Sequence, residues 1–189
     1  MQSALSALAA LTDQQDKRRF ERAGPWGVSP KYYTVEDEHD IEVVELLVGS
    51  AFVLGQAAIT QAVSIIKKIR EKAGKPPCVP CEKRGIMELV APVHNETGLS
   101  KITIIDAAAN YSKHHYEWSD DWSGPPGSKP TIDIVVKLGL GPKGYHNLEH
   151  ALRELGMLPN NILPLAQLVG QWRAQLAAHI RKELSKRSL

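Results

Sequence analysis

The feature that most constrains the fold of this chain is a long run without charged residues. It extends from Leu46 to Ile66, and the basic residues Lys67, Lys68 and Arg70 follow it closely. Such a run is about as long as a membrane span, but it contains polar side chains that are costly to place in lipid. These are Ser50, Gln56, Thr60, Gln61 and Ser64. We therefore expect the buried central helix of a bundle, and a membrane span over residues 46–66 is the lesser alternative.

Residues on both sides extend this run into one helix from about Glu36 to Ala73. Acidic side chains open it, basic side chains close it and Gly74 supplies a stop signal. The spacing of apolar residues predicts further helices, which are 3–22, 100–117, 131–138, 147–155 and 161–185. The sequence therefore predicts an all-α fold, a helical bundle of about five to six helices with a long central helix.

Length and composition fit a single globular core, with 189 residues of which 43% are hydrophobic. We divide the chain into an N-terminal helix and linker, residues 1–30, and a helical-bundle domain, residues 31–189. The formal net charge of +2 is too small to bind nucleic acid through bulk electrostatics, so such a function needs a local patch. The two cysteines, and an apolar N-terminal stretch without a preceding basic residue, favour a cytoplasmic protein.

One segment, residues 146–150, has the spacing H-x-x-E-H of the inverted zinc proteases. Two histidines four residues apart on one helix face can bind a zinc ion, with the glutamate activating water. We expect Asn147 to cap the helix, however, which leaves His146 outside it. A third ligand would have to come from a downstream acidic residue such as Glu154. We therefore interpret His146 and His150 as residues of an ordinary amphipathic helix.

A second metal-like motif is the C-x-x-C spacing of Cys78 and Cys81 in a proline-rich loop. The loop lacks the strand and helix of a thioredoxin-type site, and no second cysteine pair completes a zinc site, although His94 is a conceivable further ligand. We favour an incidental pair. With neither motif complete, we expect no bound metal and no cofactor.

The third candidate is a polar face near the end of the predicted helix 100–117. Asn110, Lys113, His114 and Glu117 recur at intervals of three and four residues and therefore share one side of a helix. A solvated helix end is the simpler interpretation. A functional site is the alternative, because a histidine that titrates near neutrality stands beside a lysine that can contact phosphate.

These residues carry a family resemblance. A long apolar helix, then a helix ending in Ala-Asn-Tyr-x-Lys-His-x-x-Glu-Trp over residues 109–118, then a polar loop and further helices, resembles the HEPN domains (higher eukaryote and prokaryote nucleotide-binding). Many of these are bacterial toxins or defence ribonucleases, in which an arginine and a histidine separated by four to six residues meet their copies across a dimer. His114 matches the histidine and Asn110 the polar residue often found between the two. Alanines fill residues 107–109, where the arginine would stand.

The resemblance implies a homodimer in a bacterial defence, toxin or RNA-related system, with RNA or a protein as partner. It leaves open whether the chain is an enzyme. In a ribonuclease, His114 would act as general acid or base, Lys113 would contact phosphate and Asn110 would orient the reacting groups. Without the arginine, the chain would be a degenerate ribonuclease or a non-catalytic RNA-binding protein. The alternative is a structural or partner-binding helical protein without an active site.

Overall fold

The computed structural model describes residues 1–23, 35–74, 79–141 and 146–186, and these residues form an all-α structure. Its α-helices and their bounds are α1 Gln2–Ala23, α2 Val35–Lys72, α3 Lys83–Glu88, α4 Lys101–His114, α5 Lys129–Lys137, α6 Asn147–Glu154 and α7 Leu163–Ser185. A 3-10 turn, η1 His115–Glu117, continues α4. The described residues contain isolated β-bridges but no strand. The all-α fold and the long central helix are therefore as predicted.

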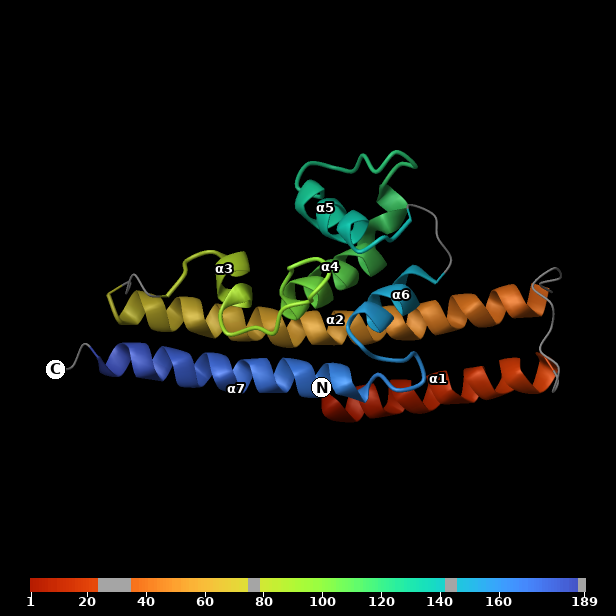
Figure 1. Cartoon of the computed structure of the whole chain (residues 1–189), viewed down its shortest axis with the longest axis horizontal. Helices are drawn as coiled ribbons and strands as arrows, with labels where there is room; N and C mark the ends of the chain where they lie inside the picture. Colours follow the sequence, from red (N-terminus) through yellow and green to blue (C-terminus); the bar gives the residue numbers. More distant parts are fainter. Residues whose placement is uncertain (24–34, 75–78, 142–145, 187–189) are drawn as a thin grey trace.

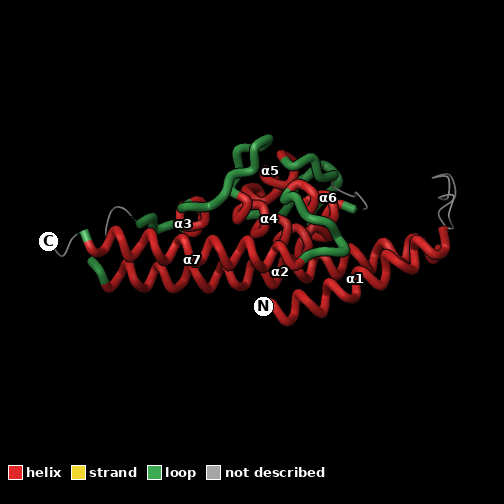
Figure 2. Tube along the Cα trace, turned by 60° about the horizontal axis from the view of Figure 1, so that its bottom comes forward, coloured by secondary structure: helices red, strands yellow, loops and turns green. Residues whose placement is uncertain are grey.

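The helix α2 is the axis of the bundle. Helices α1 and α7 lie one after the other along one side of α2, while α3, α4 and α6 pack against its other side (Figure 1, Figure 2). Helix α5 packs on α4 and forms the outermost part of that side. The expected linker, from residue 24 to residue 30, falls outside the described residues. Leu5 of α1 is fully buried and belongs to the same hydrophobic core as the other helices.

The apolar run of α2 divides into a packed side and a polar side. Over residues 41–72 the helix is long and apolar enough to cross a membrane by length and composition, a test that the core helix of a soluble bundle also passes. Phe52 and Ile59 are fully buried, whereas Thr60 and Gln61 are exposed. Because α1, α3, α4, α6 and α7 all contact this helix, the buried part of its apolar run belongs to the core of the bundle, whereas Leu46 and Ile65 are exposed.

Local signals explain most helix ends. Ser100 caps α4, where its hydroxyl oxygen accepts the backbone N–H of Thr103 at 3.0 Å. Gly156 follows α6 with a positive φ of 79°, a conformation that glycine adopts without steric cost. The start of α6 differs from the expectation, because His146, with φ 70°, is the N-cap and Asn147 is the first helical residue. The amide of Asn147 is used in tertiary hydrogen bonds instead.

Helices α4 and α7 come close to α2 where α2 carries Gly55. A Cβ atom built on Gly55 would lie 2.9 Å from Leu165 Cδ2 of α7 and 3.1 Å from Ile105 Cγ2 of α4. Both neighbours are fully buried, so they have little room to move away. The absence of a side chain at Gly55 therefore lets α4 and α7 approach α2 at the same level.

This contact yields a stability prediction. We expect Gly55→Ala to lower the free energy of unfolding by about 1–2 kcal/mol, because the clash outweighs the helix propensity that alanine adds. Gly170→Ala is the matched control, since Gly170 also lies inside a helix but a Cβ there meets nothing within 4 Å. It should raise the free energy of unfolding by roughly 0.5–1 kcal/mol. Urea denaturation measures both, and a Gly55→Ala protein as stable as Gly170→Ala would disprove the close contact.

Candidate functional site

Buried polar side chains indicate where the bundle holds more than a hydrophobic core. Those with less than a tenth of their surface exposed are Thr12, Gln56, His94, Ser100, Thr103, Asp106, Asn147 and Glu149. Two groups of them involve several helices. One joins α2 to α4 around Asp106, and the other lies at the start of α6 around Glu149. Both contain residues, or neighbours of residues, that the sequence singled out.

The first group is centred on the amide of Gln56 in α2. Its Nε2 atom donates to Asp106 Oδ1 and to Asn110 Oδ1, both at 2.8 Å. Its Oε1 atom accepts a hydrogen bond of 2.6 Å from Lys113 Nζ. One polar side chain inside the apolar run is thus satisfied by successive turns of α4, which fixes how the two helices lie against each other.

Two lysines close this network from the solvent side. Lys83 Nζ of α3 lies 2.6 Å from Asp106 Oδ1 and 2.8 Å from Oδ2. The Asp106 side chain is 12% exposed and that of Lys83 40% exposed, so the carboxylate is buried while its partner reaches in from the surface. Lys113 contacts the neutral amide of Gln56, and within the described part of the chain it meets no carboxylate.

The structure separates the predicted polar face of α4 into two parts. Asn110 and Lys113 both bind Gln56 and face α2. His114 instead lies at the surface, where its Nδ1 atom is 3.1 Å from Glu117 Oε1. The reason is that consecutive residues of an α-helix point about 100° apart, so Lys113 can face α2 while His114, the next residue of α4, faces solvent.

The positions of the missing HEPN arginine lie inside the bundle. Ala107 is 2% exposed, and Ala108 and Ala109 are fully buried. A guanidinium at any of these places would lose its water without gaining room in the tightly packed contact. The core of this bundle therefore has room only for small residues at the positions where HEPN domains carry the arginine.

Aromatic rings continue outward from α4 as a stack. The rings of Tyr111 and His115 are stacked, with centroids 4.7 Å apart and an angle of 16° between their planes. The rings of His115 and Tyr116 are 3.8 Å apart and tilted by 38° to each other. The stack begins in the core with Tyr111 and ends at Tyr116, which is 85% exposed. Because Tyr116 is exposed and supported by the ring of His115, it offers a surface on which another flat ring can stack.

The second group lies at the start of α6 and is organised by Glu45 of α2. Its two carboxylate oxygens accept the backbone N–H groups of Leu148 at 3.0 Å and Glu149 at 3.1 Å. Glu45 thus supplies the cap that α6 lacks in its own sequence. Burial raises the pKa of Glu45, the nearby negative charge of Glu149 adds to the increase, and the two backbone hydrogen bonds oppose it.

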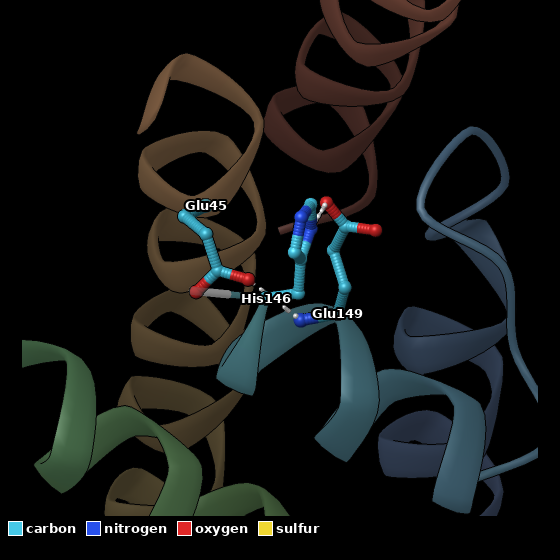
Figure 3. Close-up of side chains that lie close together, drawn as sticks. All are labelled: Glu45, His146 and Glu149. Atoms are coloured by element: carbon cyan, nitrogen blue, oxygen red, sulfur yellow. Dashed lines mark hydrogen bonds and ion pairs between the residues drawn. The ribbon is translucent and has the colours of Figure 1, made fainter. Parts of the chain in front are cut away.

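His146 and Glu149 complete this group. His146 Nδ1 lies 3.0 Å from Glu149 Oε1, and one ligand atom each from Glu45, His146 and Glu149 all lie within 4.8 Å of one another. Figure 3 shows Glu45 reaching from α2 towards the first turn of α6, where the other two side chains stand next to each other. His150 is turned away and binds the carbonyl oxygen of Leu138 at 3.0 Å. The histidine pair of the H-x-x-E-H motif is therefore not brought together.

The cysteine motif stays incomplete in the described residues. Cys81 is an exposed free thiol, and Cys78 falls outside the residues that the structure describes. His94, the conceivable third ligand, is buried with both ring nitrogens occupied: Nδ1 meets Thr97 Oγ1 at 2.9 Å and Nε2 meets Glu154 Oε2 at 3.2 Å. His94 therefore serves the packing of its own loop against α6.

Sequence reasoning missed three residues of these groups, which are Gln56, Lys83 and Glu45. Gln56 carried a signal, because an amide inside an apolar helix needs a partner. Lys83 and Glu45 carried none, since each acts on a helix that is remote in sequence and each is a common surface residue type. Only the packing of α3 and α6 against α4 and α2 reveals their roles.

Fold and site together define an all-α helical bundle in which a long central helix organises two polar groups. The comparisons with known proteins find no family model, no curated protein and no solved structure that matches this chain. The function is therefore argued from the residues themselves.

The contact between Lys83 and Asp106 yields a second stability prediction. In a double-mutant cycle of Lys83→Met and Asp106→Asn, we expect a coupling free energy of about 1 kcal/mol or more, because the single change Lys83→Met leaves a buried carboxylate without its cation. The exposed pair Arg84 and Glu88, at 2.8 Å, is the matched control. Its coupling should stay below roughly 0.5 kcal/mol. Equal coupling in the two pairs, measured by urea denaturation, would contradict the role of Asp106 as a buried anchor.

Proposed function

We propose that this chain is a HEPN-like RNA-binding protein without ribonuclease activity, of a bacterial defence, toxin or RNA-related system, and that single-stranded RNA binds at the outer end of α4. The observation that carries the proposal is the ring stack that ends at the exposed Tyr116. Proteins that bind single strands commonly stack unpaired bases on exposed aromatic side chains and hold the backbone with cations.

The cation for this site is Lys113, one helical turn before Tyr116. Lys113 is an exposed residue, and its ammonium group contacts a neutral amide and not a carboxylate, so its positive charge is not neutralised by that contact and can attract a phosphate. His114, whose side chain is 48% exposed, stands between them in sequence and adds a second group that can donate to a phosphate oxygen. A base on Tyr116 and its phosphate near Lys113 would together occupy this surface.

The negative charges that follow Tyr116 in the chain limit the length of RNA that can bind to this surface. Asp120 and Asp121 come shortly after Tyr116, and hydrogen bonds from Ser119 and Ser123 lower the pKa of Asp121 to about 2. The Asp121 carboxylate is therefore ionised at any physiological pH and repels phosphate. We expect the site to hold a short single-stranded segment of a few nucleotides and to reject a duplex, whose phosphates would extend over the acidic loop.

The absence of cleavage follows from the neighbourhood of His114. In the HEPN domains the positive charge that stabilises the transition state beside the histidine belongs to an arginine, whose planar guanidinium can hold two phosphate oxygens at once, whereas Lys113 is only a point charge. The alanines 107–109, at the places of that arginine, are buried, and the Glu117 carboxylate lies 3.1 Å from the His114 imidazole. These contacts support binding without catalysis. The homodimer implied by the HEPN resemblance remains part of the proposal and would place two copies of this surface in one molecule.

RNA binding is tested with a short fluorescently labelled single-stranded RNA in an anisotropy titration at low salt. Tyr116→Ala should weaken binding about five- to a hundredfold, because it removes a stacking surface. Lys113→Gln should weaken binding and reduce the salt dependence by about one counterion. Val136→Ala and Lys182→Gln are the controls, since the first removes an exposed apolar side chain and the second an exposed lysine, each from another helix.

Further measurements separate the proposal from its alternatives. The melting temperature of Tyr116→Ala should stay close to that of the wild type, because the ring is mostly exposed. RNA cleavage by the wild type that disappears in His114→Ala would overturn the non-catalytic part of the proposal. A wild type that fails to bind RNA at low salt would favour the structural or partner-binding alternative.

A further inference from the structure

Three side chains with metal-binding atoms meet where α2 passes the first turn of α6. One ligand atom each from Glu45, His146 and Glu149 lie within 4.8 Å of one another (Figure 3). Zinc holds nitrogen and oxygen ligands at about 2.0–2.2 Å, which puts neighbouring ligand atoms about 3–3.5 Å apart in a tetrahedral site. Small side-chain rotations bridge this difference. We propose that these three residues bind one divalent transition-metal ion, for which Zn²⁺ is the probe.

Each of the three residues has a lone pair that can coordinate an ion. The carboxylate oxygens of Glu45 each accept one backbone N–H group, at 3.0 and 3.1 Å, and an oxygen of this kind has a second lone pair. His146 uses Nδ1 towards Glu149, and within the described residues its Nε2 atom has no protein partner. One imidazole and two carboxylates form a donor set that suits zinc and related ions better than magnesium or calcium, which prefer oxygen alone.

The negative charge of the two carboxylates also favours a bound cation. The Glu149 side chain is 7% exposed, and one of its carboxylate oxygens lies within 4.8 Å of a carboxylate oxygen of Glu45. The nearest arginine, Arg153, is 63% exposed and its Nη2 atom is 3.8 Å away, beyond hydrogen-bond distance. Two carboxylates in partly buried surroundings repel each other unless positive charge lies between them. A divalent ion neutralises both at once.

A pocket lined by two of the three residues, His146 and Glu149, gives an ion access and open coordination positions. Its volume is about 500 Å³, and His146 and Glu149 form part of its wall together with His150 and Arg153. A site with three protein ligands next to an open pocket leaves the fourth position for water or for a ligand atom. The arginine and the ion together would favour a small anion in this pocket.

The sequence predicts no bound metal because neither the H-x-x-E-H motif nor the cysteine pair has a complete ligand set within its own segment. The structure offers Glu45 from a helix that is remote in sequence, and it turns His150 away from His146. The proposed ligand set therefore shares only His146 with the histidine pair that the motif suggested. This difference makes His150 a matched control.

The proposal is tested by titrating Zn²⁺ into chelator-treated full-length protein in a calorimeter. We expect one ion per chain for the wild type, and affinities at least about tenfold lower for Glu149→Gln and for His146→Asn. Asparagine is chosen at residue 146 because it tolerates the positive φ of 70° there. His150→Gln should bind as the wild type does. Cys81→Ser, which removes the exposed thiol as a competing ligand, should do so as well.

Melting temperatures with and without Zn²⁺ provide a readout that does not depend on heats of binding. Zinc should raise the melting temperature of the wild type and of His150→Gln but not that of His146→Asn, because only a protein that binds the ion when folded is stabilised. The melting temperatures without metal show whether each variant folds. If His146→Asn does not fold, Glu149→Gln takes its place in the comparison. The proposal is overturned by a wild type without saturable binding. Binding that survives His146→Asn and Glu149→Gln, or that is lost in His150→Gln or Cys81→Ser, overturns it too.

Discussion

The contact between α2 and α4 is the constraint on which the rest of this bundle depends. Gly55 on one helix and the buried alanines 107–109 on the other leave space for the two backbones to approach closely. At this distance the amide of Gln56 reaches Asp106 and Asn110 directly. The apolar contact alone would allow α4 to slide along α2, but the amide fixes one register, since any shift would leave buried polar groups without partners.

The same central helix also determines where α6 begins. Glu45 lies several turns before Gln56 and accepts the first backbone N–H groups of α6, a task usually performed by a side chain next to the helix itself. This arrangement leaves Asn147 free to donate to the hydroxyl of Tyr111 at 2.6 Å and to the carbonyl of Gly141 at 2.7 Å. One helix therefore positions both polar groups of the molecule.

The two candidate sites differ in the ligands that their surroundings suit. The end of α4 presents an open ring and a lysine on the surface, which fits an extended polymer. The group at α6 is recessed, rich in carboxylates and next to a pocket, which fits an ion. Tyr111 touches both, because its hydroxyl meets the first residue of α6 while its ring begins the stack that ends at Tyr116. An ion at α6 would therefore act close to the base of that stack.

The sequence by itself determined the helices of eight or more residues, because apolar spacing and stop signals such as Gly74 and Gly156 act within a few residues of the chain. It did not predict the short helix α3, whose six residues are too few to show a helical period. It also marked Asn110, Lys113 and His114 as unusual, although it placed them on one face with Glu117. Only the tertiary structure decided which polar groups meet: Gln56 with Lys113, Lys83 with Asp106, and Glu45 with the start of α6. These pairs join different helices, and a helical pattern fixes the direction of a side chain around its own axis but not the neighbour that it will face.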